Sequence, residues 1–254
     1  MEGLHHRDEG SGPPVVLLHG LASTVRVFDE VISGGGNRYR FVAVDLPRSG
    51  RSKSWAASTP AAIADRLMPW LEKRGLKRFA VVGHSFGGLV ALELAARWPG
   101  VVSQLVVAAA PALGLPTQMR QFLEHPTADV AIGWISRLPM YRRAVRQYFE
   151  WLWVERGTLT DRHLDIYEEA LRAEGVWEGM LEAGRAVASW RLPLEQLRAA
   201  KVPTKIIWGE KDPLVPLLHG EHLATSLNAP FTVLPHIGHC IPEQRPKAIL
   251  EALG

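Results

Sequence analysis

Cysteine and long apolar stretches are almost absent from this sequence. Cys240 is the single cysteine among 254 residues, so an internal disulfide is excluded and the chain is compatible with a reducing compartment. No apolar run approaches the length needed to span a bilayer, and the amino-terminal residues lack the apolar stretch of a secretory signal. We therefore expect a cytoplasmic protein.

A large excess of charge of one sign is also missing. The formal net charge is +3, from 29 Lys and Arg against 26 Asp and Glu. The densest basic spot is Arg142, Arg143 and Arg146, and Glu150 and Glu155 follow it. This mixture is typical of a solvated helix face, whereas a nucleic-acid site needs a clustered basic surface. We expect no nucleic-acid partner and no membrane span, and nothing in the sequence indicates an oligomeric state.

The remaining composition is that of a soluble globular protein, with 47% hydrophobic and 22% charged residues. A chain of this length fits one large α/β domain or one domain that carries an insertion. Strand and helix patterns alternate up to residue 110, whereas residues 111–191 show helical periodicity and no convincing strand. We expect a core domain of residues 1–110 and 192–254, with residues 111–191 inserted as a helical cap.

The stretch around Ser85 is the most informative part of the chain. Residues 79–82 form a short valine-rich run typical of a strand buried on both faces, and residues 89–96 carry helical spacing. Between them stands Gly83-His84-Ser85-Phe86-Gly87. An abrupt turn from strand to helix strains the residue at the turn, and side chains at the flanking glycine positions would collide there. Ser85 is then held at a helix amino terminus, where developing negative charge is favoured.

This pattern is a nucleophile elbow, and here the chain resembles the α/β-hydrolase family. The resemblance spans nearly the whole chain outside the cap. It implies a mostly parallel central sheet flanked by helices, with an all-helical cap inserted. The amino-terminal end is short for the family, which leaves room for one or more missing edge strands.

Three further loops carry the catalytic part of the resemblance. The His19-Gly20-Leu21 loop follows a buried strand, and in the family such a loop supplies half of the oxyanion hole. Residues 209–216 resemble the family's G-x-x-D-x-x-x-P loop, which places the triad acid at Asp212. The dipeptide Gly238-His239 matches the position of the family's catalytic histidine. The order Ser, Asp, His along the chain is that of the α/β-hydrolases.

Each of these residues has a chemical role in the predicted reaction. Ser85 attacks the acyl carbon, His239 takes its proton and returns it to the leaving alcohol, and Asp212 orients His239. The backbone N–H groups of Leu21 and Phe86 stabilise the tetrahedral oxyanion. Water activated by His239 then hydrolyses the acyl-enzyme. No metal or organic cofactor is required.

Rival residues stand close to two of these positions. His236 lies in the same loop as His239, but Gly238 permits the turn that presents His239, which favours His239. Glu210 lies near Asp212 but closer to the preceding strand, and it is more typical of surface charge.

Other polar residues near the expected site favour structural roles. His19 is expected to hold its loop by hydrogen bonds. Asp45 is expected to accept hydrogen bonds in a loop, residues 45–52, that resembles the family's D-x-P-G-x-G-x-S loop, with Arg48 where glycine is usual. His84 is expected to point away from the nucleophile and to be packed.

Five of the nine tryptophans fall within residues 111–191. Most of them are expected to form the core of the cap and its seam with the main domain. Some aromatic and methionine side chains of the cap are instead expected to line an apolar pocket above Ser85. The candidates are Met119, Phe122, Trp134, Met140, Phe149 and Trp153.

We therefore expect a serine hydrolase that cleaves carboxylic esters with small to medium, largely apolar groups. The same residues are compatible with hydrolysis of C–C bonds in β-diketone-like substrates, of lactones, of thioesters or of peptides, and with perhydrolysis. Serine at the elbow argues against haloalkane dehalogenases and epoxide hydrolases, which use aspartate there. A non-catalytic ligand receptor on the same scaffold is the alternative of a different class, and the intact triad argues against it.

Overall fold

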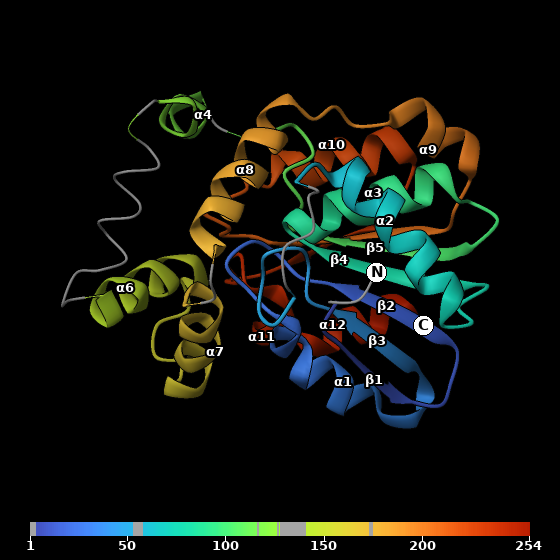
Figure 1. The fold of residues 1–254 in the computed structure, drawn as a ribbon, viewed down its shortest axis with the longest axis horizontal. Helices are drawn as coiled ribbons and strands as arrows, with labels where there is room; N and C mark the ends of the chain where they lie inside the picture. The colour runs from blue at the N-terminus through green and yellow to red at the C-terminus, as the bar shows by residue number, and fades with distance from the viewer. Residues whose placement is uncertain (1–3, 53–57, 116, 126, 128–140, 173–174) are drawn as a thin grey trace.

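The computed structural model describes residues 4–52, 58–115, 117–125, 127, 141–172 and 175–254 (Figure 1). Its centre is a seven-stranded sheet in the order β1-β3-β2-β4-β5-β6-β7. Neighbouring strands pair in parallel except β1 and β3, which are antiparallel. The strands are β1 (His6–Gly10), β2 (Pro14–Leu18), β3 (Arg40–Val44), β4 (Phe79–His84), β5 (Val102–Ala108), β6 (Thr204–Gly209) and β7 (Phe231–Leu234).

Helices cover both faces of this sheet, as the fold class predicted from the sequence requires. On one face lie α2 (Pro60–Lys73), α3 (Phe86–Arg97), α9 (Leu194–Ala200) and α10 (Leu218–Leu227) (Figure 1). On the other lie α1 (Asp29–Gly35), α11 (Ile241–Gln244) and α12 (Pro246–Leu253). Two short 3₁₀ helices, η1 (Val25–Phe28) and η2 (Gly36–Arg38), flank α1.

The helix starts follow local capping chemistry. The Thr59 hydroxyl accepts a hydrogen bond from the N–H of Ala62 at 3.1 Å, and Pro60 occupies the first position of α2. Thr160 caps α7 (Asp161–Leu171) in the same way, through the N–H of His163.

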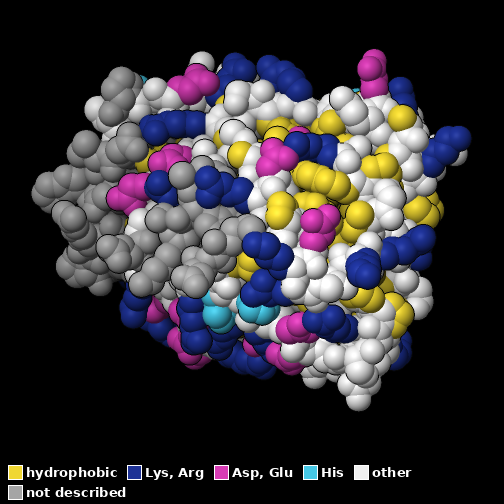
Figure 2. All heavy atoms as spheres, turned by 45° about the vertical axis from the view of Figure 1, so that its right-hand side comes forward, with side chains coloured by type: hydrophobic (Ala, Val, Ile, Leu, Met, Phe, Trp, Pro, Cys, Tyr) yellow, Lys and Arg dark blue, Asp and Glu magenta, His cyan; other side chains and the backbone are white. Residues whose placement is uncertain are grey.

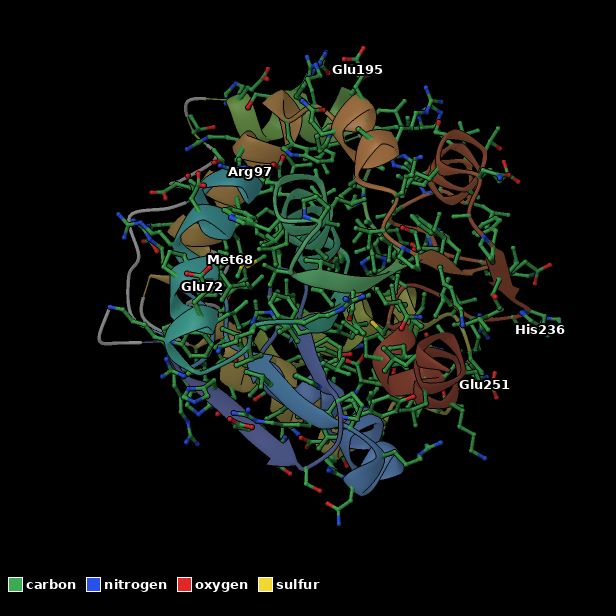
Figure 3. All side chains as sticks on the ribbon, turned by 90° about the vertical axis from the view of Figure 1, so that its right-hand side faces the viewer. Met68, Glu72, Arg97, Glu195, His236 and Glu251 are labelled. Atoms are coloured by element: carbon green, nitrogen blue, oxygen red, sulfur yellow. The ribbon has the colours of Figure 1, made fainter. Side chains whose placement is uncertain are left out.

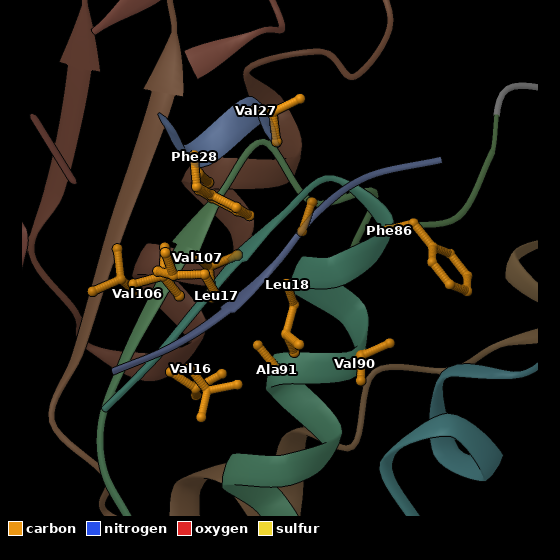
Figure 4. Close-up of a cluster of buried hydrophobic side chains, with 14 of the residues drawn as sticks. Val16, Leu17, Leu18, Val27, Phe28, Phe86, Val90, Ala91, Val106 and Val107 are labelled. Carbon is orange, nitrogen blue, oxygen red and sulfur yellow. The ribbon is translucent and has the colours of Figure 1, made fainter. Parts of the chain in front are cut away.

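The sheet core is built from the valine-rich strands. Side chains of β2 and β5 alternate between the two faces of the sheet, those of α3 pack on one of these faces, and each is almost fully buried (Figure 4). The buried set in this region includes Val16, Leu17, Leu18, Val90, Ala91, Val106 and Val107. Strands buried on both faces need apolar residues at successive positions, which explains these runs.

The edge strand β1 was not expected from the sequence. Its residues, His6–Gly10, are polar or charged and partly exposed, so they carry no apolar run that marks a strand. This segment is a strand because it pairs antiparallel with β3. An ion pair between Asp8 and Arg40, at 2.6 Å, also links the two strands. Edge strands are often charged, which limits pairing with other chains.

Residues 111–191 contain helices and no strand in the part that the structure describes. They are α4 (Thr117–Glu124), α6 (Tyr141–Trp153), α7 and α8 (Val176–Ser189), and they lie at one end of the sheet (Figure 1). Polar contacts join them to the rest of the chain. Arg26 pairs with Glu169 of α7 at 2.5 Å, and the indole N–H of Trp190 donates to Glu93 of α3 at 2.7 Å.

Basic and acidic side chains are mixed over the face shown in Figure 2, with apolar side chains scattered between them. Arg142 and Arg146, which belong to the densest basic spot of the sequence, pair with acidic groups of α7. Arg142 contacts Asp165 at 3.2 Å and Arg146 contacts Asp161 at 2.6 Å. Among the described residues, no helix is both long enough and apolar enough to cross a bilayer.

Candidate active site

Ser85 stands at the turn between β4 and α3, in a backbone conformation with φ 53° and ψ −121°. Residues other than glycine adopt such conformations at a cost, and surrounding contacts must hold them. The flanking glycines make this possible. A Cβ at Gly83 would lie 2.4 Å from the carbonyl oxygen of Gly87, and one at Gly87 would lie 2.2 Å from that of Leu18. Ser85 is thereby presented beyond the carboxyl end of β4.

Ser85, His239 and Asp212 form one connected chain of hydrogen bonds. The distance from His239 Nε2 to Ser85 Oγ is 2.9 Å, and that from His239 Nδ1 to Asp212 Oδ2 is 2.7 Å. Asp212 Oδ1 accepts from the backbone N–H groups of Leu214 and Val215, both at 2.9 Å. With Nδ1–H donated to the carboxylate, Nε2 is free to accept the hydroxyl proton of Ser85.

The loop that carries His239 is held from two sides. The His239 N–H donates to the carbonyl oxygen of Leu152, at the end of α6, at 2.7 Å. The His239 carbonyl oxygen accepts from His84 Nε2 at 2.8 Å. Burial lowers the pKa of His84 to about 3, so its ring stays neutral, and the nearby His239 adds to this shift. His84 is packed as expected, and its ring centroid lies 4.9 Å from that of His239.

Glycine is required at position 238 because another part of the backbone lies very close to it, and not because of its own backbone conformation. Its φ is outside the left-handed region. A Cβ at this position would lie 2.0 Å from the carbonyl oxygen of Leu152, the same oxygen that accepts the His239 N–H. His236, the rival histidine, is exposed at the outer edge of the molecule (Figure 3).

Gly238→Ala is expected to displace the end of α6 from the His239 loop. The added methyl group should destabilise the fold by about 1–3 kcal/mol, and a shift of His239 by about 1 Å should lower kcat/KM about 100-fold. Thermal unfolding and initial rates measure the two effects. Gly100→Ala is the matched control, since nothing lies within 4 Å of its Cβ position. Equal behaviour of the two variants would contradict this account of Gly238.

Leu21 and Phe86, the two residues predicted as oxyanion donors, line the same cavity as Ser85. As the first residue of α3, Phe86 has an N–H with no acceptor inside the helix. The Leu21 loop approaches Ser85 so closely that a Cβ at Gly20 would lie 2.9 Å from the Cβ of Ser85. Parallel pairing of β2 with β4, with Leu18 opposite Gly83, brings the two loops together.

His19 and Asp45 have the structural roles expected of them. The ring of His19 is fully buried, and its Nε2 accepts from the N–H of Leu46 at 3.0 Å, so Nδ1 carries the proton and donates to the Gly20 carbonyl oxygen. Burial lowers the pKa of His19, which keeps the ring neutral. Asp45 accepts from the N–H of Val25 at 2.7 Å.

Arg48 occupies the position where the similar loop of the family has glycine. Its φ of 57° shows that the backbone keeps the left-handed conformation that glycine adopts easily. The guanidinium pairs with Glu182 of α8 at 3.1 Å. The side chain therefore links the loop after β3 to a helix of the 111–191 segment.

A cavity of about 270 Å³ opens over Ser85 and His239, between the core loops and the helices of residues 111–191. Of the six predicted pocket residues, Phe149 lines this cavity. Trp153 does not line it, because the indole is buried inside the helical segment with its N–H 3.2 Å from the Tyr167 hydroxyl. Trp134, Met140 and the side chains of Met119 and Phe122 lie outside the described residues.

Most of the cavity wall comes from residues that the sequence did not single out. The apolar part includes Leu115, Leu123, Leu152, Met180, Leu181, Val187, Leu214 and Val215. Leu214 and Val215 stand two and three positions after Asp212, so their place near this carboxylate could have been predicted from the sequence. The α8 residues had no such signal, since an apolar helix face facing a cavity has the same spacing as one facing a core.

Glu243 is a buried acid at the edge of this cavity. Its Oε1 accepts from the Tyr167 hydroxyl, and its Oε2 is buried without a hydrogen-bond partner among the described residues. Burial raises the pKa of Glu243 to about 8, against the opposing effect of Tyr167. The neighbouring Cys240 is buried too, and burial raises the pKa of its thiol well above its ordinary value. Such a thiol is inert at neutral pH.

Glu243→Gln is expected to change how stability depends on pH. Below pH 4.5, the ordinary value, the carboxyl is protonated in both states, and its stabilising contribution is complete. As pH rises toward 8, only the unfolded state loses the proton, so the free energy of unfolding falls by up to about 1.4 kcal/mol per pH unit. The variant lacks this loss, so its Tm should gain on the wild type between pH 5 and pH 8.

Thermal unfolding at several pH values measures this difference. Glu251→Gln, at an exposed position of α12 (Figure 3), is the control and should keep a constant Tm difference from the wild type. A constant difference for Glu243→Gln as well would contradict the burial of a protonated carboxyl.

Comparison with known proteins assigns the fold to a family. Residues 15–252 match the model of the Alpha/beta hydrolase family. The chain belongs to this family. This membership supports hydrolase activity. Among the described residues, no group of three or more His, Cys, Asp or Glu side chains is placed so that it could hold a metal ion.

Individual relatives agree with this assignment. The chain is 27% identical to an uncharacterized hydrolase, YugF, of Bacillus subtilis, over 98% of this chain and 91% of that protein. It is 28% identical to the pimeloyl-[acyl-carrier protein] methyl ester esterase of Nitrosomonas europaea, over 96% and 97%. The structure of a thermophilic esterase from Thermogutta terrifontis superimposes with a TM-score of 0.82 at 22% identity, over 98% and 91%, which shows the shared fold.

Proposed function

We propose that this hydrolase cleaves carboxylic esters through an acyl-enzyme intermediate. Ser85 is the nucleophile, His239 the general base and then acid, and Asp212 the residue that orients His239. The observation that carries the proposal is the unbroken hydrogen-bond chain from Ser85 Oγ through His239 to Asp212, with Ser85 and His239 lining the cavity.

The oxyanion of the tetrahedral intermediate would be bound by the N–H groups of Leu21 and Phe86. Backbone donors fixed before the reaction stabilise charge without reorganising, which is the larger part of the catalytic effect in many enzymes. Both residues line the cavity beside Ser85.

The substrate class follows from the cavity. Its wall is mainly aliphatic and aromatic, so acyl or alcohol groups that are small to medium and largely apolar fit it. Residues 111–191 act as the cap that shapes this selectivity, since α6, α7 and α8 all contribute to the wall. A relative of similar length is named as a methyl ester esterase, which favours ester cleavage over the other reactions of this fold.

A substrate panel tests the proposal. We expect p-nitrophenyl butanoate and hexanoate to be hydrolysed with kcat/KM above about 10⁴ M⁻¹s⁻¹, within the ordinary range for enzymes, and faster than a lactone, a thioester or a β-diketone of matched size. If the diketone or the lactone were turned over fastest, hydrolysis of that substrate would be the activity, in place of ester hydrolysis. Stoichiometric binding without turnover would favour a receptor.

A further inference from the structure

One side chain of the cavity wall has a hydrogen-bond donor that the proposed reaction does not use. His219, near the start of α10, is 8% exposed and lines the cavity beside the loop of the proposed acid. Its Nδ1 accepts from the N–H of Leu113 at 3.2 Å. Within the described part of the chain, Nε2 has no hydrogen-bond partner.

The bond from Leu113 decides which ring nitrogen carries the proton. Because Nδ1 is the acceptor, the neutral ring of His219 must hold its proton on Nε2. Burial lowers the pKa of His219, His222 lowers it further, and Asp212 acts in the opposite direction with a smaller effect than burial. The neutral ring therefore presents Nε2–H as a donor on the cavity wall, and because this nitrogen is not among the buried unpaired atoms, the oxygen of a bound ligand can reach it.

Besides His219, the Ser23 hydroxyl and Glu243 Oε2 belong to lining residues and have no hydrogen-bond partner among the described residues, whereas other polar groups of the wall are paired. His84 donates to the carbonyl of His239, and the Tyr167 hydroxyl donates to Glu243. Among the described residues that line the cavity there is no lysine or arginine. A carboxylate bound there would lack a cation to compensate its charge, whereas a neutral oxygen meets the single donor of His219 without that cost.

We propose that His219 is a specificity-determining residue that donates Nε2–H to a second, neutral oxygen of the substrate, separate from the ester carbonyl attacked by Ser85. The preferred substrates are then oxo-esters, in which a ketone carbonyl lies elsewhere in the acyl or alcohol group. This inference rests on the proposed ester hydrolysis and adds a substrate class to it.

The test moves a ketone along otherwise matched substrates. Methyl 3-, 4- and 5-oxohexanoate are compared with methyl hexanoate, and 3-oxobutyl butanoate is compared with butyl butanoate. The readout is the ratio of kcat/KM for each oxo-ester to that of its plain partner. We expect the wild type to prefer at least one oxo-ester about tenfold, the effect of one hydrogen bond to an otherwise unpaired donor.

Three variants separate the donor from the structural role of the ring. His219→Asn keeps an acceptor near the Nδ1 position for Leu113 but removes the donor at Nε2, so the preference should fall about tenfold. His219→Gln places an amide donor near the Nε2 position and should restore part of the preference. His222→Asn, at an exposed position of the same helix, should leave the ratio unchanged.

Two results would overturn the assignment of His219. One is a wild-type ratio near one for every oxo-ester, and this needs no variant to fold. The other is an unchanged ratio in His219→Asn while both rates fall together, which is the signature of a purely structural role. Failure of the proposed function looks different, because then neither series is hydrolysed by the wild type, or hydrolysis survives in Ser85→Ala.

Discussion

Replacing Ser85 with alanine is expected to lower kcat/KM for an activated ester by about 10⁴- to 10⁶-fold. Ser85 lines the cavity and its Oγ is hydrogen-bonded to His239, so under the proposed mechanism its loss leaves His239 with no hydroxyl to activate. The residual rate would come from substrate binding and from the Leu21 and Phe86 N–H groups. Initial rates with p-nitrophenyl butanoate measure the effect.

The fold should survive this change, because alanine occupies the same backbone position and fills less space. We expect the Tm of Ser85→Ala to stay within a few degrees of the wild type, since the hydroxyl makes no described bond besides that to His239. Ser33→Ala, at an exposed serine of α1, controls for loss of a hydroxyl and should keep full activity. Turnover within tenfold of the wild type in Ser85→Ala would exclude Ser85 as the nucleophile.

Asp212→Asn is expected to lower kcat by about 10⁴-fold. The N–H groups of Leu214 and Val215 both point at one carboxylate oxygen of Asp212, so the asparagine carbonyl oxygen should take that place. Its NH₂ group then faces Nδ1 of His239 and donates to it. The ring is forced to carry its proton on Nε2, where it can no longer accept the proton of Ser85.

Pre-steady-state and steady-state rates with the same ester measure this loss. Asp65→Asn, an exposed acid of α2 that pairs with Arg97, is the matched control for removal of a carboxylate. A loss smaller than tenfold in Asp212→Asn would show that Asp212 does not set the tautomer of His239. The acid role would then have to pass to another residue.

The elbow was predictable from the sequence because its chemistry is local. The glycines around Ser85 are needed by contacts within a few residues of the turn and with β2, and the buried valine run announces the strand before it. The positions of Asp212 and His239 were predictable from loops that resemble those of the family. Parallel strands then bring the three loops to one edge of the sheet.

Contacts between segments far apart in the chain could not be predicted from the sequence. The carbonyl oxygen of Leu152 accepts the amide N–H of His239 and leaves no room for a side chain at position 238. Leu152 belongs to α6 and stands 87 residues before His239 in the chain. The strand β1 forms through pairing with β3 and has no apolar pattern of its own. The donor of His219 depends on Leu113, so no pattern near residue 219 could show it.

Active-site labelling determines whether Ser85 is the nucleophile. The protein is treated with a fluorophosphonate, and the modified peptide is identified by mass spectrometry after digestion. We expect one adduct per chain, located on the Ser85 hydroxyl, formed more slowly in Asp212→Asn and absent from Ser85→Ala. An adduct on any other residue, or an unlabelled wild-type protein that still hydrolyses esters, would contradict this expectation.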